Sequence, residues 1–217
     1  MQDKVVNLAT DRGQSEWGPT RSRATRNVLV QAAIALWRTN GYANTTVADI
    51  CRAAGVSKAL FYFYFPHKED VLFEAGVLST ENAHRRAREL LRKPYEVSAV
   101  IGAALTSLEQ TMRRNPPELI IEAVLEGYRQ EHRAQAEGKT HDRISTLFLD
   151  LFKRAQTDRK LPRDVDVAHL AHLAQSMVGE GARHWAAGLY GGRSYAEVVG
   201  RDIAALVSGF AAAPPAH

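Results

Sequence analysis

Apolar residues in the first third of the chain recur at the spacing of a helix. Five of them lie three or four residues apart and share one stripe, namely Leu29, Ala32, Ala33, Leu36 and Trp37. Asn40 and Gly41 follow, and glycine readily adopts the left-handed backbone that commonly ends a helix. The pattern therefore predicts a first helix from about residue 25 to residue 40.

A helix-turn-helix arrangement follows at once. Thr46 stands three residues before Asp49, the arrangement of a capping hydroxyl and an acid at a helix start. The inward stripe of this short second helix consists of Val47, Ile50, Cys51 and Ala54. Gly55 ends it, and Ser57 can cap a third helix that begins at Lys58. So short a turn between two helices is typical of a helix-turn-helix unit.

In the third segment local propensity and the neighbouring elements favour different structures, because residues 61–65 are all aromatic. Aromatic runs favour a strand. A lone strand between two capped helices would leave its backbone groups unpaired, whereas a helix satisfies its own. We therefore predict a helix on which Phe61 and Phe65 point into the core. Ala59 and Phe63 then lie on the opposite face, and Pro66 ends the segment.

The remainder of the chain has the pattern of further helices separated by proline and glycine. Breaks are expected at Pro94, residues 115–117, Gly138, residues 161–162 and residues 190–192. No hairpin and no alternation of strand with helix occurs, so the predicted fold class is all-α. The predicted domains are a flexible basic and polar arm at 1–24, a three-helix unit at 25–70, a larger helical domain at 71–212 and a disordered tail at 213–217.

Charge separates the small N-terminal unit from the rest. The 217 residues are 45% hydrophobic and 24% charged, an ordinary globular balance, with a net charge of +4. The first 68 residues hold nine Lys and Arg against four Asp and Glu, and the rest hold 19 against 20. Such an asymmetry is expected where one domain meets a polyanion, although ordinary surfaces also vary by a few charges.

Cysteine usage and apolar run lengths indicate the compartment. Cys51 is the only cysteine, which excludes an intrachain disulfide and a zinc site built from several cysteines. We interpret it as a small buried hydrophobe, with a redox sensor as the weaker alternative. The first 27 residues contain no apolar run of signal-peptide length. No segment approaches the roughly 18 apolar residues of a membrane span. We expect a soluble, cytoplasmic protein without a membrane partner.

Residues 25–72 resemble the DNA-binding domain of the tetracycline-repressor (TetR) family of bacterial transcriptional regulators. The matching positions are Ala32-Ala33 and Leu36, Asn40-Gly41-Tyr42, Thr45-Thr46-Val47, Asp49-Ile50, Ala53 to Lys58, Phe61 to Phe65, and Lys68-Glu69. Outside this segment the likeness is confined to length and helical character. The resemblance implies three DNA-binding helices, a larger ligand-binding domain and a homodimer formed mainly by the last two helices. It also implies repression that a small molecule relieves.

In a helix-turn-helix unit the second helix, here the third of the chain, enters the DNA major groove, where its outer face reads base edges. The candidate DNA contacts are Thr46, Ser57, Lys58, Ala59, Leu60, Tyr62, Phe63, Tyr64 and Lys68. Lys58 is expected to contact guanine or phosphate; the tyrosines and Lys68 are expected to contact phosphate. Leu60 and Phe63 depart from the small or polar residues common in the family. We expect both to meet thymine methyl groups.

Two C-terminal apolar stripes are candidates for the dimer interface, one on a helix near 167–187 and one on a helix near 195–212. Their members are Ala171, Ala174, Val178, Gly181, Ala182, Val199, Ile203, Leu206, Val207 and Phe210. Small residues allow close approach, and such helices can pair with their copies as a four-helix bundle around a two-fold axis. The plain alternative is that both stripes face the core of their own domain.

An effector pocket is expected among the middle helices, because methionine and aromatic side chains suit a lipophilic ligand. The candidate lining residues are Met112, Tyr128, Phe148, Phe152, Met177 and Trp185. An ordinary core would use the same residue types. Glu122 and Glu126 lie one turn apart, and we expect them to be solvated rather than to hold a cation.

Other chemistry has little support in the motifs. His169 and His172 lie one turn apart and could join His132, His141 or His184 on a metal, but no cysteine or acidic cluster accompanies them. We predict no metal and no cofactor. No motif of nucleophilic catalysis or phosphate binding occurs, so we predict a non-enzymatic repressor released from a palindromic operator by a small molecule.

Two alternatives to the repressor stay open. One is an all-helical small-molecule-binding protein or enzyme with a vestigial DNA-binding unit. The other is a DNA-bending architectural protein.

Overall fold

The computed structural model describes residues 19–138 and 147–212. The predicted arm up to residue 18, the predicted tail at 213–217 and the metal candidate His141 lie outside the described residues. Helix α1 (Pro19–Asn40) begins earlier than expected, so residues 19–24 are helical rather than part of an arm. Proline suits this first position because its fixed φ matches a helix and its missing N–H has no intrahelical partner there.

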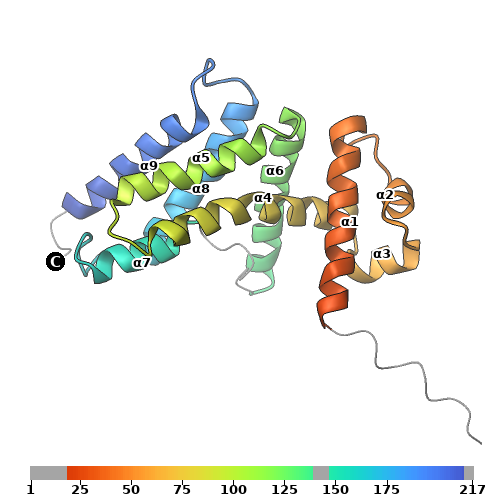
Figure 1. Ribbon diagram of the computed structural model, residues 1–217, viewed down its shortest axis with the longest axis horizontal. Coiled ribbons are helices and arrows are strands. Elements are labelled where there is room, and N and C mark those ends of the chain that lie inside the picture. The colour runs from red at the N-terminus through yellow and green to blue at the C-terminus, as the bar shows by residue number, and fades with distance from the viewer. Residues whose placement is uncertain (1–18, 139–146, 213–217) are drawn as a thin grey trace, which may run out of the picture.

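Every regular element in the described residues is a helix, which confirms the all-α prediction. After α1 come α2 (Val47–Ala54), α3 (Lys58–Tyr64), α4 (Lys68–Leu90), α5 (Val97–Met112), α6 (Pro117–Ala136), α7 (Leu149–Thr157), α8 (Val167–Ala186) and α9 (Tyr195–Ala212). Helices α1 to α3 form one end of the molecule (Figure 1), and α5, α7, α8 and α9 form the other.

The N-terminal helices surround a small core of their own. Trp37 of α1, Ile50 of α2 and Phe61 of α3 are fully buried in it. Leu72 of α4 and Leu119 of α6 complete this core. Because α6 lies beyond the N-terminal unit in the sequence, its leucine holds that unit against the larger domain.

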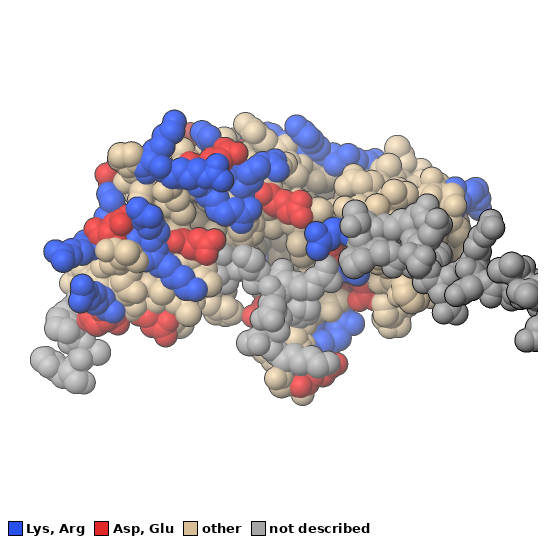
Figure 2. All heavy atoms as spheres, turned by 60° about the horizontal axis from the view of Figure 1, so that its bottom comes forward, with Lys and Arg blue, Asp and Glu red and all other residues tan. Residues whose placement is uncertain are grey.

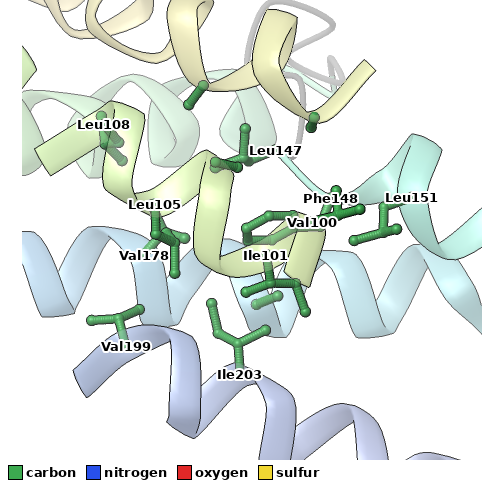
Figure 3. Packing of buried hydrophobic residues seen from close by; sticks show 14 of the residues in the cluster. Val100, Ile101, Leu105, Leu108, Leu147, Phe148, Leu151, Val178, Val199 and Ile203 are labelled. Atoms are coloured by element: carbon green, nitrogen blue, oxygen red, sulfur yellow. The ribbon is translucent and has the colours of Figure 1, made fainter. Parts of the chain in front are cut away.

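The larger core lies between α5, α7, α8 and α9 and the second half of α4. Figure 3 shows Val199 and Ile203 of α9 pointing toward Leu105 and Ile101 of α5. Phe148, at the start of α7, is fully buried in the same cluster. Two helices serve both cores. Val71 and Leu72 of α4 belong to the small cluster and Ala83 and Ala87 of α4 to the large one, and α6 likewise contributes Leu119 to the small cluster and Ile120 to the large one.

The two C-terminal stripes predicted as a dimer interface face mainly the core of their own domain. Eight of the ten residues are buried within a single chain, namely Ala171, Ala174, Val178, Gly181, Ala182, Val199, Ile203 and Val207. Leu206 and Phe210 are half-buried against the same cluster. The physical reason is that α5 already covers the apolar face of α9.

Gly181 shows how closely α8 and α9 pack. A Cβ atom at this position would lie 2.4 Å from Cγ2 of Val199, closer than two carbon atoms can approach. The small residue expected to bring two subunits together therefore brings two helices of one chain together.

A buried carboxylate fixes the start of α9. Glu109 of α5 is only 6% exposed, and it accepts hydrogen bonds from the Ala196 amide at 3.0 Å and the Ser194 hydroxyl at 2.7 Å. Arg113 donates to its other oxygen at 2.5 Å. Burial alone would raise the pKa of Glu109, but these hydrogen bonds to the ionised form outweigh it and lower the pKa. The ionised Glu109 thus pairs an otherwise free amide at the N-terminus of α9.

Replacing Glu109 by Gln should lower the free energy of unfolding at pH 7 by about 1–3 kcal/mol, because charge-assisted hydrogen bonds to a buried group are lost. The pKa is lower in the folded state than in the unfolded state. The extra stability is therefore complete above the unfolded pKa of about 4.3 and is lost as pH falls through the folded value. Urea unfolding curves of the wild type and E109Q should converge toward pH 3.

The matched control is Glu81→Gln, since Glu81 is an exposed carboxylate within α4. This variant should differ little from the wild type at either pH. A constant difference between E109Q and the wild type across the whole pH range would contradict the role given to the ionised carboxylate.

Candidate nucleic-acid interface

Helices α2 and α3 begin and end where the sequence predicts, because each terminus is capped. The Asp49 amide donates to Thr46 Oγ1 at 3.2 Å, and the Thr46 amide donates to Asp49 Oδ2 at 3.0 Å. This reciprocal capping box, led by the hydrogen bond to the Thr46 side chain, lowers the pKa of Asp49. Gly55 adopts a φ of +67° and ends α2, and Ser57 Oγ accepts from the Leu60 amide at 3.1 Å.

The aromatic segment is helical, which confirms the prediction of a helix despite the strand propensity of consecutive aromatic residues. Phe61 and Phe65 are fully buried, as predicted, whereas Phe63 is 75% exposed and Tyr62 52% exposed. Lys58 and Ala59 are exposed, and Leu60 is half-buried. One face of α3 thus anchors the helix in the small core, and the other presents a cation, a small residue and two aromatic rings to solvent.

Tyr64 and Lys68 do not face outward as expected. The Tyr64 hydroxyl is buried and has no hydrogen-bond partner in the described part of the chain, so it does not reach a DNA phosphate in this conformation. Lys68 Nζ donates to the carbonyl oxygens of Tyr42 and Thr45 at 3.1 Å each and lies 4.2 Å from the centre of the Tyr42 ring. The ammonium therefore fastens the loop before α2 to the start of α4.

A second charged pair holds the recognition unit from the side of α1. Arg26 lies 2.5 Å from Oε1 of the buried Glu74, and its guanidinium lies 4.6 Å from the centre of the Phe65 ring. Phe65 is the residue that ends α3, so this contact positions the last turn of the helix. Arg26 and Glu74 stand 48 positions apart in the sequence, and no local pattern marks them as partners.

A polar network joins α6 to the start of α4. Gln130 Nε2 donates to Asp70 Oδ1 and to Glu126 Oε1, at 3.0 Å in each case. Glu126 is only 1% exposed, contrary to the expectation that it is solvated. Its burial is tolerated because Arg129, at 3.3 Å, and Arg133 also pair with its carboxylate.

Tyr42 lies in the loop before α2 and connects this loop to the start of α4. Its hydroxyl donates to Glu69 Oε1 at 3.3 Å. Burial, followed by the charge of Glu69 and then of Glu126 and Glu122, raises the pKa of Tyr42, so the phenol stays protonated and remains a donor. The sequence analysis did not predict this role. It named Tyr42 only as a position that matches the family, in the turn after the first helix.

Five of the six predicted pocket residues lie in the large core or against it. Met112, Phe148 and Phe152 are buried in the large core, and Met177 and Trp185 pack half-buried against it. Tyr128 is 41% exposed on α6. Its hydroxyl lies 3.0 Å from the place where a Cβ of Gly179 would stand.

The histidines considered as possible metal ligands form no metal site within the described residues. His169 and His172 are exposed on α8, and His172 lies 4.0 Å from Glu131. His184 Nε2 lies 3.0 Å from Glu180. No group of three or more His, Cys, Asp and Glu residues within 19–138 and 147–212 is arranged to hold a metal ion.

The described helices are also unsuited to a bilayer. None of them combines the length and the hydropathy that crossing a membrane requires.

Comparison with known families and proteins connects this geometry to gene regulation. Residues 29–75 match the family described as bacterial regulatory proteins of the tetR family. The transcriptional regulator UidR of Escherichia coli K12 is 23% identical over 163 residues, which are 75% of this chain and 80% of UidR. HbdR of Aromatoleum sp. strain CIB, also described as a transcriptional regulator, is 44% identical over 97 residues, 43% of this chain and 39% of HbdR.

Solved structures extend the likeness to the larger domain. FadR of Thermus thermophilus, a transcriptional repressor solved with lauroyl-CoA, has a TM-score of 0.71 and 25% identity, over 88% of this chain and 100% of that one. FadR of Bacillus subtilis, solved with stearoyl-CoA, shares the fold with a TM-score of 0.58 and 17% identity, over 84% of this chain and 98% of that one.

The alternation of buried and exposed rings on α3 predicts opposite results for two Phe→Ala substitutions. Phe61→Ala should destabilise the N-terminal unit by about 3–5 kcal/mol, because it empties a fully buried site. Phe63→Ala should change stability by less than about 0.5 kcal/mol, because its ring is already in solvent. Thermal unfolding followed by circular dichroism measures both. Equal destabilisation by the two variants would mean that α3 is oriented differently.

Proposed function

Because this chain belongs to the tetR family of bacterial regulatory proteins, we propose that it represses transcription from a palindromic operator and is released by a small molecule. That it is a DNA-binding transcriptional regulator is shown by the family and by its relatives. The observation that carries the finer proposal is the exposed outer face of α3, beside a second capped helix. Its relatives are described as regulators, and we propose that this chain likewise has no catalytic activity.

Each outer residue of α3 has a distinct part in the proposed complex. Lys58, in the first turn, supplies a donor for guanine O6 and N7 or for phosphate. Ala59 is small and lets the helix backbone approach the base edges. Phe63, with Leu60 behind it, offers apolar surface for thymine methyl groups. The Tyr62 hydroxyl is placed to donate to a phosphate oxygen.

Thr46 and Ser57 contribute mainly through the helix starts that they cap. Both residues are exposed, and the amides of the first turn of α2 point in the same direction as the capping groups. A phosphate near a helix N-terminus is favoured by these amides and by the helix dipole. We assign Thr46 and Ser57 to positioning on the DNA backbone rather than to base recognition.

The proposed dimer uses the parts of α8 and α9 that the fold leaves uncovered. Of the predicted interface residues, Leu206 and Phe210 are half-buried, and Ala205 beside them is exposed. A second copy packed on this face would bury the remaining apolar surface around a two-fold axis. Two recognition helices would then reach half-sites one helical turn apart, as helix-turn-helix dimers do.

The proposed effector is an amphipathic molecule with a long apolar part. The support is the likeness to Thermus thermophilus FadR, a repressor solved with lauroyl-CoA, over most of both chains. The large core of this chain is rich in residues that could surround such a chain, including Phe148, Phe152 and Met112. They are packed together here, so a ligand would select a conformation in which they part. Its effect on DNA affinity is limited by its differential affinity for the two states, typically about 1–3 kcal/mol of coupling.

Two substitutions on α3 test operator recognition. Phe63→Ala should relax selectivity at one base pair of each half-site by about 1–3 kcal/mol, because a thymine methyl group loses its partner. Lys58→Gln should weaken binding and, if the lysine meets phosphate, lower the slope of log K against log salt by about 1. The operator is first located by genome-wide binding, and affinities are then measured on a randomised operator library.

Arg114→Gln is the matched control for Lys58→Gln, since it also removes an exposed cation but outside α2 and α3. It should leave the order of preferred sites unchanged. Unaltered selectivity of Phe63→Ala at every operator position would reject the proposed thymine contact.

The dimer proposal predicts that Ala205→Arg gives a monomer. A bulky cation at this exposed position leaves the chain's own core intact but prevents a second α9 from approaching. The mass in solution, measured by light scattering, should fall by half, and operator affinity should fall with it. Ala99→Arg, on the exposed side of α5, is the control. A dimer that persists in Ala205→Arg would place the interface elsewhere.

A further inference from the structure

The regulatory domain carries an open hollow of about 590 Å³ at the end of the molecule away from α1 to α3. The turn between α4 and α5 forms one wall and the last turn of α7 forms the other. The lining residues are Leu91, Arg92, Lys93, Pro94, Tyr95, Glu96, Arg154, Asp158 and Lys160. None of them belongs to the predicted pocket.

Positive charge in this hollow exceeds what its carboxylates neutralise. Arg154 Nε lies 2.7 Å from Asp158 Oδ2, and Lys160 Nζ lies 3.3 Å from Glu96 Oε1. Arg92 and Lys93 have no carboxylate within ion-pair distance among the described residues. Two cations on one wall are therefore free to bind an anion.

A second hollow of about 400 Å³ adjoins the first and adds two more cations. It shares Lys160 and is lined further by Arg159, Leu161, Pro162, Arg163 and Ala211. Neither Arg159 nor Arg163 forms an ion pair with a described carboxylate. Figure 2 shows Lys and Arg side chains gathered at the end of the molecule where α7 lies in Figure 1.

The backbone at Arg159 is unusual for an arginine. Its φ is +59°, the left-handed conformation that glycine normally takes after a helix, and the Lys160 amide closes the end of α7 on the Ala155 carbonyl at 2.7 Å. A side chain in this conformation costs about 1 kcal/mol relative to glycine. The strained turn carries a free guanidinium at the rim of the hollow.

Apolar residues form the floor of the hollow. Leu91 and Tyr95 pack against the large core, and Leu161 is buried in it. The Tyr95 hydroxyl donates to Asp158 at 3.0 Å. Burial, together with this hydrogen bond, raises the pKa of Tyr95 to about 12, so the phenol adds no negative charge at neutral pH. The site thus offers free cations at its rim and apolar surface beneath them.

Operator DNA does not account for this charge. Helix α4 has 23 residues and is about 35 Å long. It runs from the recognition unit at its start to the turn before α5 at its end (Figure 1), and that turn forms one wall of the hollow. The cations therefore lie about a helix length from α3, too far to touch the base pairs that α3 would read.

We propose that the joined hollows bind the phosphate groups of a phosphorylated organic ligand. Arg92, Lys93, Arg159 and Arg163 supply charge-assisted hydrogen bonds, and the guanidinium fork matches the oxygens of a phosphate in pairs. The apolar part of the ligand lies against Leu91 and continues toward the large core. The inference rests on the proposed function, because such a ligand is the effector of the regulatory domain.

The test compares coenzyme A with pantetheine, which has the same thiol arm but neither the phosphates nor the adenosine. Calorimetry with the full-length protein in 150 mM salt, where screening weakens non-specific attraction, should show binding of coenzyme A alone. The double variant Arg92→Gln and Lys93→Gln should weaken that binding by at least about tenfold, because each free cation loses a charge-assisted bond. Arg114→Gln, beyond the other end of α5, should bind as the wild type does.

Arg159→Gly separates binding from folding. Glycine relieves the left-handed strain, so this variant should be as stable as the wild type or more stable, and yet bind coenzyme A several-fold more weakly. Equal affinity in the double variant and the wild type would overturn the inference. The inference would also be overturned if the protein bound anionic vesicles or random duplex DNA but did not bind coenzyme A.

Operator binding without any ligand is measured in parallel on the same variants. If coenzyme A fails to bind but operator DNA still binds, the hollow is rejected and the repressor proposal stands. If operator DNA fails to bind, the repressor proposal is rejected whatever the result with coenzyme A.

Discussion

Helix α4 is the longest connection between the two domains, because it contributes to both hydrophobic cores. Its first half contributes Val71 and Leu72 to the small core, and its second half contributes Ala83 and Ala87 to the large one. An unbroken helix transmits much of a tilt, because a sharp kink would have to disrupt its backbone hydrogen bonds. The recognition helix therefore takes its position from the packing of α4 in the regulatory domain.

Polar contacts around the start of α4 make that connection specific. Lys68 fastens the loop before α2, and Gln130 ties Asp70 to α6. Leu119 of the same α6 is buried in the small core. A shift of α6 relative to α4 would have to break the hydrogen bond between Gln130 and Asp70 or carry the helix-turn-helix along. The domain boundary expected at residue 70 thus lies near the start of α4, where polar contacts join α4 to the helix-turn-helix and to α6.

Local signals allowed the N-terminal fold to be predicted, whereas contacts between distant segments could not be. Caps at Thr46 and Ser57 and the four-residue spacing of Phe61 and Phe65 act within one turn, so the sequence displays them. Apolar stripes such as the one through Val199 look the same whether α5 or a second subunit covers them. Glu126 is buried because Gln130, Arg129 and Arg133 surround it, although an acid on a helix ordinarily indicates solvent.

The geometry of α4 also explains how a ligand at the distal end could act on DNA. The hollow is bounded by the end of α4 on one side and the end of α7 on the other, so an anion held between them affects their separation. A tilt of about 5° over a helix about 35 Å long moves its far end by about 3 Å. Half-sites one helical turn apart, about 34 Å, tolerate little change in the spacing of two recognition helices. Each subunit of the proposed dimer would add its own displacement, so a small rotation at the proposed phosphate site would change the spacing of the two recognition helices.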